Sequence, residues 1–264
     1  PGHADFGGEV ERVLSMVDSV LLLVDAVDGP MPQTRFVTSK AFERGLNPIV
    51  VVNKIDRDGA RPDWVVDQVF DLFDALGANE AQLDFPVVYT SAVLGIAGGD
   101  PEQMSNDMTP LFEAIETHVP APEVDATGPL QMQISALDYS SYVGVIGVGR
   151  VSRGELSTNT NVTIVGPEGV TRSGRILQVM GYEGLERIEV PSAQAGDIVC
   201  VTGIDGLLIS DTLCDPGTPD ALPALTVDEP TVSMTFQVND SPFAGREGKF
   251  VTSRNIKERL EREL

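Results

Sequence analysis

The sequence predicts an α/β domain with a parallel sheet, then an antiparallel β-barrel, then the beginning of an α+β domain. Three observations predict this order. Apolar strands alternate with amphipathic helices up to about Val119, a proline-rich stretch follows, and short β-branched segments dominate residues 130–227. With 264 residues, two domains or slightly more are expected, and a hydrophobic content of 42% is enough to give them cores. We expect domains at 1–122, 123–227 and 228–264.

Apolar runs and helical periodicity predict the elements of the first domain. The expected strands are Ser19–Ala26, Asn47–Lys54 and Phe85–Ala92. The first of them, SVLLLVDA, is nearly continuously apolar, as a strand buried on both faces requires. The expected helices are Glu9–Val17, Thr34–Arg44, Asp63–Leu76 and Thr109–His118. Strands and helices in this alternation form βαβ units and a parallel sheet.

Pro120–Pro129 is typical of a linker, and the pattern changes after it. The predicted strands of the second domain are short and closely spaced, as in an antiparallel barrel: LQMQISAL, GVIGVGRVSRG, NVTIV, GRILQVMGY and AGDIVCVTG. A further strand, TVSMTFQVN, and a helix over Asn255–Leu264 come last. One strand and one helix cannot bury their apolar faces alone, so we expect a domain that this chain does not complete.

Charge and cysteine content limit the possible partners and compartments. The chain has 18 basic and 40 acidic residues, a net charge of −22, so non-specific binding to nucleic acid or membranes is not expected. Cys200 and Cys214 fit no metal-ligand spacing, and we expect neither a disulfide nor a metal site. No apolar run could span a bilayer, and no signal peptide is visible. These features predict a cytoplasmic protein.

The sequence NKID, Asn53–Asp56, directly follows the apolar run PIVVV. It therefore lies at the carboxyl end of a buried strand, where open α/β sheets bind ligands. The carboxylate of Asp56 can accept two hydrogen bonds from the ring N–H and amine of guanine, a donor pair that adenine lacks. The stem of Lys54 can lie across the base, and Asn53 can tie neighbouring loops together. The motif predicts guanine binding; the alternative is an incidental polar loop.

A second loop, TSA, Thr90–Ala92, ends the next strand, and its Ser91 lies 38 residues after Asn53. That interval fits one strand–helix–strand unit, so the two loops are expected at the same sheet edge. Ser91 could brace the loop, and the backbone N–H of Ala92 could reach the guanine carbonyl oxygen. Alone, a turn of small residues is a weak signal, but together with NKID it supports a guanine site.

The chain opens with Pro-Gly-His. Gly2 would let the backbone approach a γ-phosphate and donate its N–H there. His3 would orient an attacking water, which is the role that phosphoryl transfer requires. Taken alone, a histidine so near the N-terminus would more simply belong to a disordered tail.

Four stretches together resemble the TypA/BipA family of ribosome-associated translational GTPases: PGHADFGGEVERVLSMVDSVLLLVDAVDGPMPQT, NKID, SA and GREGKFVTSR. The resemblance covers essentially the whole chain. It implies a GTPase domain, an elongation-factor-type β-barrel and a ferredoxin-like third domain, followed by further domains. It also implies the ribosome, its RNA and its proteins as partners, and GTP hydrolysis with Mg²⁺ as the reaction. The resemblance therefore implies a truncated P-loop GTPase-like parallel sheet with helices, followed by the β-barrel and the start of the ferredoxin-like α+β domain.

A phosphate-binding loop of the form GxxxxGK[ST] does not occur in these 264 residues. The family pattern places that loop, a switch loop and a magnesium-binding aspartate before Pro-Gly-His, so we expect the chain to be a fragment. The loop's N–H groups and lysine hold the β- and γ-phosphates. We therefore expect the fragment to be inactive, to bind GTP or GDP weakly, and to carry no bound cofactor or metal of its own.

Truncation would also expose an edge of the sheet. In a Ras-like sheet the first strand pairs beside Ser19–Val24, and without it that strand keeps unpaired backbone groups on an apolar edge. We expect either association of copies through this edge or a disordered N-terminal segment.

The C-terminal residues are the one locally basic segment of the chain. From Ser241 onward there are six basic and four acidic residues, the basic ones being Arg246, Lys249, Arg254, Lys257, Arg259 and Arg262. Arg246, Lys249 and Arg254 could contact ribosomal RNA phosphates. The alternative is a solvated loop and helix with internal Glu–Arg pairs.

A different class of function also fits the sequence: a non-catalytic ribosome- or protein-interaction module whose nucleotide loops are vestigial. The coding sequence upstream of Pro1 would separate the two, because a phosphate-binding loop there favours the enzyme.

Overall fold

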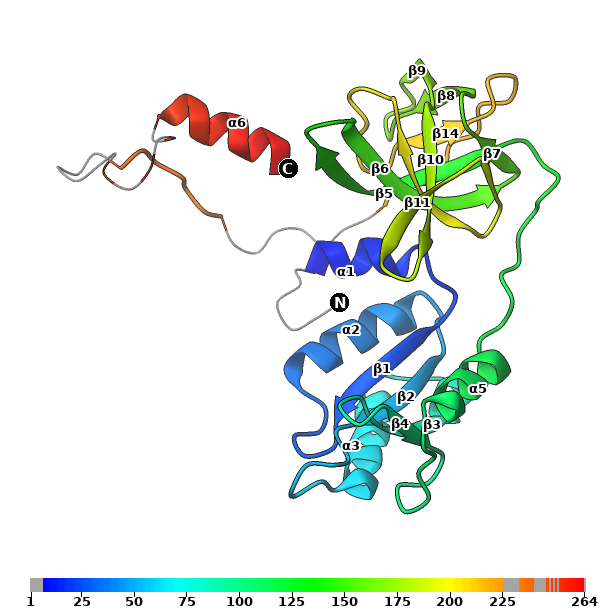
Figure 1. The fold of residues 1–264 in the computed structure, drawn as a ribbon, viewed down its shortest axis with the longest axis vertical. Coiled ribbons are helices and arrows are strands. Elements are labelled where there is room, and N and C mark those ends of the chain that lie inside the picture. The colour runs from blue at the N-terminus through cyan, green and yellow to red at the C-terminus, as the bar shows by residue number, and fades with distance from the viewer. Residues whose placement is uncertain are drawn as a thin grey trace.

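A computed structural model describes residues 7–225, 233–239, 246, 248, 250 and 252–263. It has an α/β part and a β-rich part, and helix α1 (Gly7–Leu14) lies between the two (Figure 1). The four-stranded sheet of the α/β part has the order β1-β2-β3-β4. Its strands are β1 (Val20–Asp25), β2 (Pro48–Asn53), β3 (Val87–Ser91) and β4 (Ile96–Gly98). The first three run parallel and β4 antiparallel to β3, so the predicted parallel sheet is present.

Helices cover both faces of this sheet. They are α2 (Pro32–Glu43), α3 (Pro62–Ala75), the short α4 (Glu80–Leu83) and α5 (Thr109–His118). On one face, Val65, Val69 and Phe73 of α3 pack against strand residues that include Val50 and Val52. The opposite face of β2 and β3 packs against apolar residues of α5, including Leu111 and Ile115. Strand β2 is consequently buried along its length apart from its last residue, Asn53.

Strand β1 differs from the sequence expectation, because only one of its faces is buried. Leu22 and Val24 are buried, whereas Leu21 is 39% and Leu23 60% exposed. Since β1 is the edge strand and α5 packs over β2, β3 and β4, no described helix covers the second face of β1. The prediction that the apolar run Ser19–Ala26 is buried on both faces was therefore wrong. The run marks the strand correctly but not its place in the sheet.

The second part is an eight-stranded antiparallel sheet that curls around one core, as predicted for a barrel (Figure 1). Its order is β11-β10-β13-β6-β5-β14-β8-β9, and β7 pairs separately with β12. The strands are β5 (Gln131–Ser140), β6 (Gly144–Arg153), β7 (Glu155–Ser157), β8 (Asn161–Val165), β9 (Thr171–Arg175), β10 (Gln178–Glu183), β11 (Glu186–Val190), β12 (Ser192–Gln194), β13 (Ile198–Thr202) and β14 (Thr212–Cys214). Gly149 of β6 passes so close to the Gln133 carbonyl that a side chain would collide with it.

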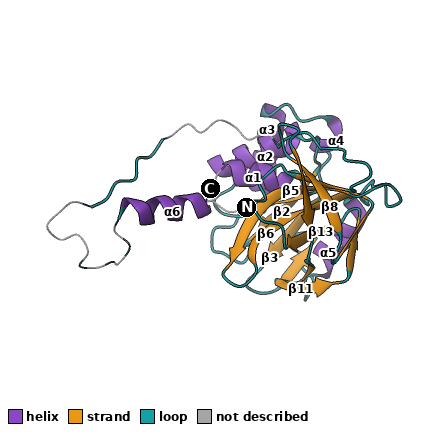
Figure 2. Cartoon of the chain, turned by 90° about the horizontal axis from the view of Figure 1, so that it is seen from above, coloured by secondary structure: helices purple, strands orange, loops and turns teal. Residues whose placement is uncertain are grey.

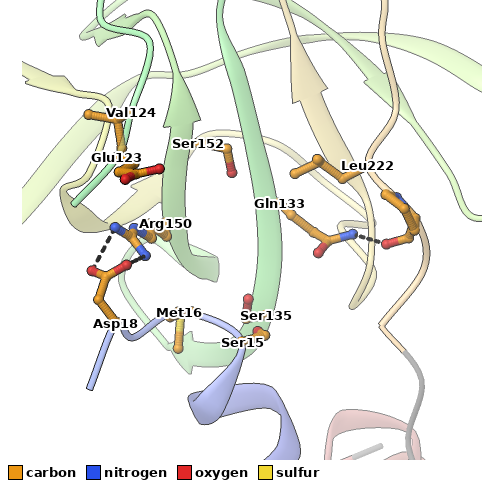
Figure 3. A pocket seen from close by; sticks show the side chains of 11 residues that line it. Ser15, Met16, Asp18, Glu123, Val124, Gln133, Ser135, Arg150, Ser152 and Leu222 are labelled. Carbon is orange, nitrogen blue, oxygen red and sulfur yellow. Dashed lines mark hydrogen bonds and ion pairs between the residues drawn. The ribbon is translucent and has the colours of Figure 1, made fainter. Parts of the chain in front are cut away.

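An ion pair joins the two parts directly. Arg150 of β6 donates from both terminal nitrogens to the Asp18 carboxylate, at 3.0 and 2.8 Å (Figure 3). Asp18 follows α1, so the pair fastens the start of β1 to the barrel. A polar pocket of about 320 Å³ lies beside it, lined by Ser15, Gln133, Ser135 and others. Such a two-pronged arginine–carboxylate contact fixes orientation as well as distance.

The C-terminal elements stand apart from both parts (Figure 2). Helix α6 (Ser253–Glu263) forms where the sequence predicts a helix. Residues 233–239, by contrast, lie within the predicted strand TVSMTFQVN but form no strand, and Met234 and Phe236 are largely exposed. A strand needs a neighbouring strand, and none of the described strands pairs with this segment. The structure describes no helix long and apolar enough to cross a membrane.

Candidate nucleotide-binding site

The carboxyl ends of β1, β2 and β3 bring the two predicted loops together. Asp25 pairs in register with Asn53, and Asn53 pairs with Thr90. The NKID loop leaves β2 at this edge, and the TSA turn ends β3 beside it. The sequence expectation that both loops share one edge of a parallel sheet is therefore what the structure shows.

Asn53 ties the two loops through a single oxygen atom. Its Oδ1 accepts hydrogen bonds from the backbone N–H of Lys54 at 2.8 Å, the hydroxyl of Thr90 at 3.1 Å and the N–H of Ala92 at 3.1 Å. Because Thr90 is buried, its hydroxyl would lose its partner without Asn53. This is the loop-tying role that the sequence suggested for Asn53.

The TSA turn is held by Ser91 as expected, but the N–H of Ala92 does not point freely at a ligand. Ser91 is fully buried, and its Oγ accepts the N–H of Leu94 at 3.3 Å. The N–H of Ala92, expected to face a guanine carbonyl, donates to Asn53 instead. A purine carbonyl would have to share this donor with Asn53.

Asp56 and Lys54 occupy different electrostatic surroundings. Asp56 is exposed, and across the described ranges no hydrogen bond or ion pair reaches its carboxylate, so both oxygens can accept from a ligand. Lys54 has a left-handed backbone, with φ of 67°. Its side chain is half exposed, and its ammonium lies 2.8 Å from a carboxylate oxygen of Asp25.

Asp25 is the site residue that the sequence did not reveal. Its side chain is only 13% exposed, and its carboxylate also accepts from Arg57 at 2.9 Å and from the N–H of Val27 at 2.8 Å. Partial burial acts to raise its pKa, but the hydrogen bonds from Lys54 and from backbone N–H groups lower the pKa to about 2. In the sequence, Asp25 is only a single acidic residue near the end of the apolar run SVLLLVDA. Its place beside the NKID loop becomes visible only in the strand register, where it pairs with Asn53.

Other candidate residues lie at the limits of the described structure. Gly2, His3 and Lys249 fall outside the described residues. Arg246 is exposed, and Arg254 pairs with Glu258 at 2.8 Å, the internal Glu–Arg pairing weighed as the alternative to RNA contact. Within the part of the chain that the structure describes, no three His, Cys, Asp or Glu side chains gather as a metal site.

Known protein families match the α/β part and the β-rich part of the chain separately. Residues 1–121 match the elongation factor Tu GTP binding domain, and residues 144–214 match elongation factor Tu domain 2. The large ribosomal subunit assembly factor BipA of Escherichia coli (strain K12) is 68% identical over all 264 residues. Those of Salmonella typhimurium and Haemophilus influenzae are each 67% identical over the same length.

The chain spans 43–44% of the length of these three relatives, while they cover all of it. The matched length includes the site loops, the barrel and the C-terminal helix. The chain belongs to the TypA/BipA family, over a stretch that joins an elongation-factor-type GTP-binding domain to an elongation-factor-type β-barrel.

Proposed function

We propose that the full-length protein is a GTP-binding translational GTPase that acts on the ribosome during assembly of its large subunit. The named role of the relatives supports the assembly step. The observation that carries nucleotide binding is the fastening of the NKID loop to the TSA turn through Asn53. It holds the groups needed to read a guanine base at the sheet edge where such ligands bind.

Each site residue has a chemical role in this proposal. The open carboxylate of Asp56 accepts from the ring N–H and amine of guanine, and the stem of Lys54 covers one face of the base. The N–H of Ala92 donates to the purine carbonyl while sharing its hydrogen with Asn53 Oδ1, and Ser91 holds the turn that presents it. Adenine offers no matching donor pair, so binding it would remove water from Asp56 without supplying donors in its place.

Competition binding tests this reading of the base. Fluorescent GDP bound to the full-length protein is displaced by unlabelled GDP, ADP or inosine diphosphate, which lacks only the exocyclic amine. We expect GDP to compete at least 100-fold better than ADP, with inosine diphosphate between them, because it keeps one of the two donors. Equal competition by GDP and ADP would instead favour the non-catalytic interaction module with vestigial loops.

Hydrolysis requires groups beyond the base site. We assign His3 to orienting the attacking water and the N–H of Gly2 to a γ-phosphate oxygen, with Mg²⁺ neutralising phosphate charge in the full-length protein. An H3A variant is expected to lower kcat by about 100-fold while leaving the GTP Kd unchanged. A changed Kd with unchanged kcat would assign His3 to binding instead.

The 264 residues by themselves are proposed to be inactive. They contain no GxxxxGK[ST] sequence, so the loop that would hold the β- and γ-phosphates is not among these residues. Calorimetry on this chain is expected to show GTP binding weaker than micromolar and no bound cofactor. Micromolar affinity would contradict this.

Partner contacts follow from the relatives and the charge distribution. We propose a cytoplasmic protein that meets ribosomal RNA through Arg246 and Lys249 in the basic C-terminal segment. Reversing both charges in the full-length protein (R246E and K249E) should weaken ribosome binding, and unchanged affinity would leave that segment a solvated loop. For the isolated 264 residues we propose association of two copies through the exposed edge of β1.

A further inference from the structure

The two carboxylate oxygens of Asp25 serve two different partners. Oδ1 accepts the N–H groups of Val27 at 2.8 Å and Asp28 at 3.3 Å, which closes the turn after β1. Oδ2 accepts the ammonium of Lys54 at 2.8 Å and the guanidinium of Arg57 at 2.9 Å. One side chain therefore shapes the loop after β1 and also reaches the NKID loop after β2.

The contact to Lys54 crosses between neighbouring strands. Asp25 is the last residue of β1 and pairs with Asn53, which immediately precedes Lys54. The left-handed backbone at Lys54 is uncommon for a residue with a side chain. With the backbone and the ammonium both fixed, the aliphatic stem between them has little freedom left.

The Asp25 carboxylate is much more buried than the two cationic side chains that bind it. The Asp25 side chain is 13% exposed, whereas Lys54 is 51% and Arg57 46% exposed. The long cationic side chains thus extend to a carboxylate that the turn already holds in place. Such an anchor removes rotamer freedom before a ligand arrives, so less is lost when the ligand binds.

We propose that Asp25 is a positioning residue for guanine recognition, holding the ammonium of Lys54 so that the stem already lies as one wall of the base site. This rests on the proposed function. Asp25 touches no ligand itself, and its effect belongs to the base half of the site. It should therefore be the same for guanosine, GDP and GTP.

The D25N variant separates the two roles of this side chain. An asparagine keeps the Oδ1 acceptor of the turn but removes the charge that binds Lys54. In the full-length protein we expect D25N to weaken guanosine and GDP equally, about tenfold (about 1.4 kcal/mol), measured by competition against fluorescent GDP. R57Q is the matched control, because it removes the other cation on the same oxygen and should change affinity less than twofold.

A double-mutant cycle identifies the lysine as the partner. K54M keeps an unbranched stem without the ammonium, so it should weaken binding about as much as D25N, and the double variant no further. Additive losses would show that Asp25 acts without Lys54 and would overturn the proposal.

Other outcomes are equally decisive. If D25N kept its affinity for guanosine and GDP while D25A bound them more weakly and was less stable, Asp25 would serve only to hold the turn after β1. Tighter binding by D25N would mean that Asp25 competes with the nucleotide for Lys54. A loss for GDP but not for guanosine would place the effect at the phosphates. If wild-type protein failed to prefer GDP over ADP, the proposed function itself would fall, a result distinct from all of these.

Discussion

At the scale of single residues, one amide oxygen organises the candidate site. Asn53 Oδ1 accepts three hydrogen bonds from two loops, and one of the donors, Thr90, is buried. The residue therefore contributes to folding and to the geometry of the base site through the same atom.

Truncating this side chain should affect both properties. We expect N53A to lower the free energy of unfolding by about 1–3 kcal/mol, because the Thr90 hydroxyl and the Ala92 N–H lose their acceptor. Urea denaturation measures the change. D58A, an exposed position in the same loop, is the control and should stay within about 0.5 kcal/mol of wild type. An equal effect of both variants would contradict the role of Asn53.

The lowered pKa of Asp25 means that this side chain stabilises the fold at neutral pH but not in acid. Its folded-state pKa of about 2 lies below the ordinary value of 3.8, so its stabilisation is present above about pH 4 and is lost as pH falls towards 2. Because both cationic partners are about half exposed, we expect a discounted contribution of roughly 1 kcal/mol. Unfolding of D25N should therefore depend less steeply on pH between 4 and 2 than that of wild type. Identical pH dependence would rule out this ion pair as a source of stability.

At the scale of elements, the described residues cover strand β1 on only one face. Leu21 and Leu23 are exposed on one face, and a groove of about 620 Å³ runs along the strand between α1 and α2. The buried hydroxyl of Thr38, which lines the same groove, finds no hydrogen-bond partner among the described residues. An apolar edge with unpaired backbone groups favours pairing with another strand.

A charge on this edge should prevent such pairing. We expect the 264-residue chain to show concentration-dependent association in light scattering and L23K to shift it to the monomer. L208K, on an exposed leucine of the β-rich part, is the control and should leave association unchanged. A wild-type chain that stays monomeric at high concentration would refute association through β1.

The sequence predicted elements whose pattern is long enough to carry a period. The helix Thr109–His118 has the expected bounds, and β2 differs from its expected range by one residue at each end. The three-residue β4 and the four-residue α4 were missed, because so few residues show no periodicity. The exposure of Leu23 and the role of Asp25 were also beyond prediction, since both depend on which elements lie beside β1.

At the scale of the whole molecule, the two parts are linked through Asp18 and Arg150. The pair is two-pronged, with Arg150 17% and Asp18 36% exposed, and it lies beside the interdomain pocket (Figure 3). Asp18 lies between α1 and β1. A displacement of either element would therefore shift or break the contact with Arg150 of the barrel.

Removing the link should uncouple the two parts on heating. We expect R150A to separate calorimetric unfolding into two transitions or to broaden it, with a loss of about 1 kcal/mol at the interface. R153A is the control, since Arg153 pairs with Asp220 within the β-rich part. A single sharp transition in R150A, unchanged from wild type, would show that other contacts hold the parts together.

We propose that the open carboxylate of Asp56 recognises guanine by accepting from its ring N–H and its amine. Xanthine carries a carbonyl where guanine carries its amine, so an amide at this position can donate where the carboxylate accepts. The most direct measurement is the relative affinity of full-length wild type and D56N for GDP and xanthosine diphosphate. This role of Asp56 means that wild type should prefer GDP and that D56N should reverse the preference, each by at least tenfold. An unchanged preference for GDP in a folded D56N protein would contradict it.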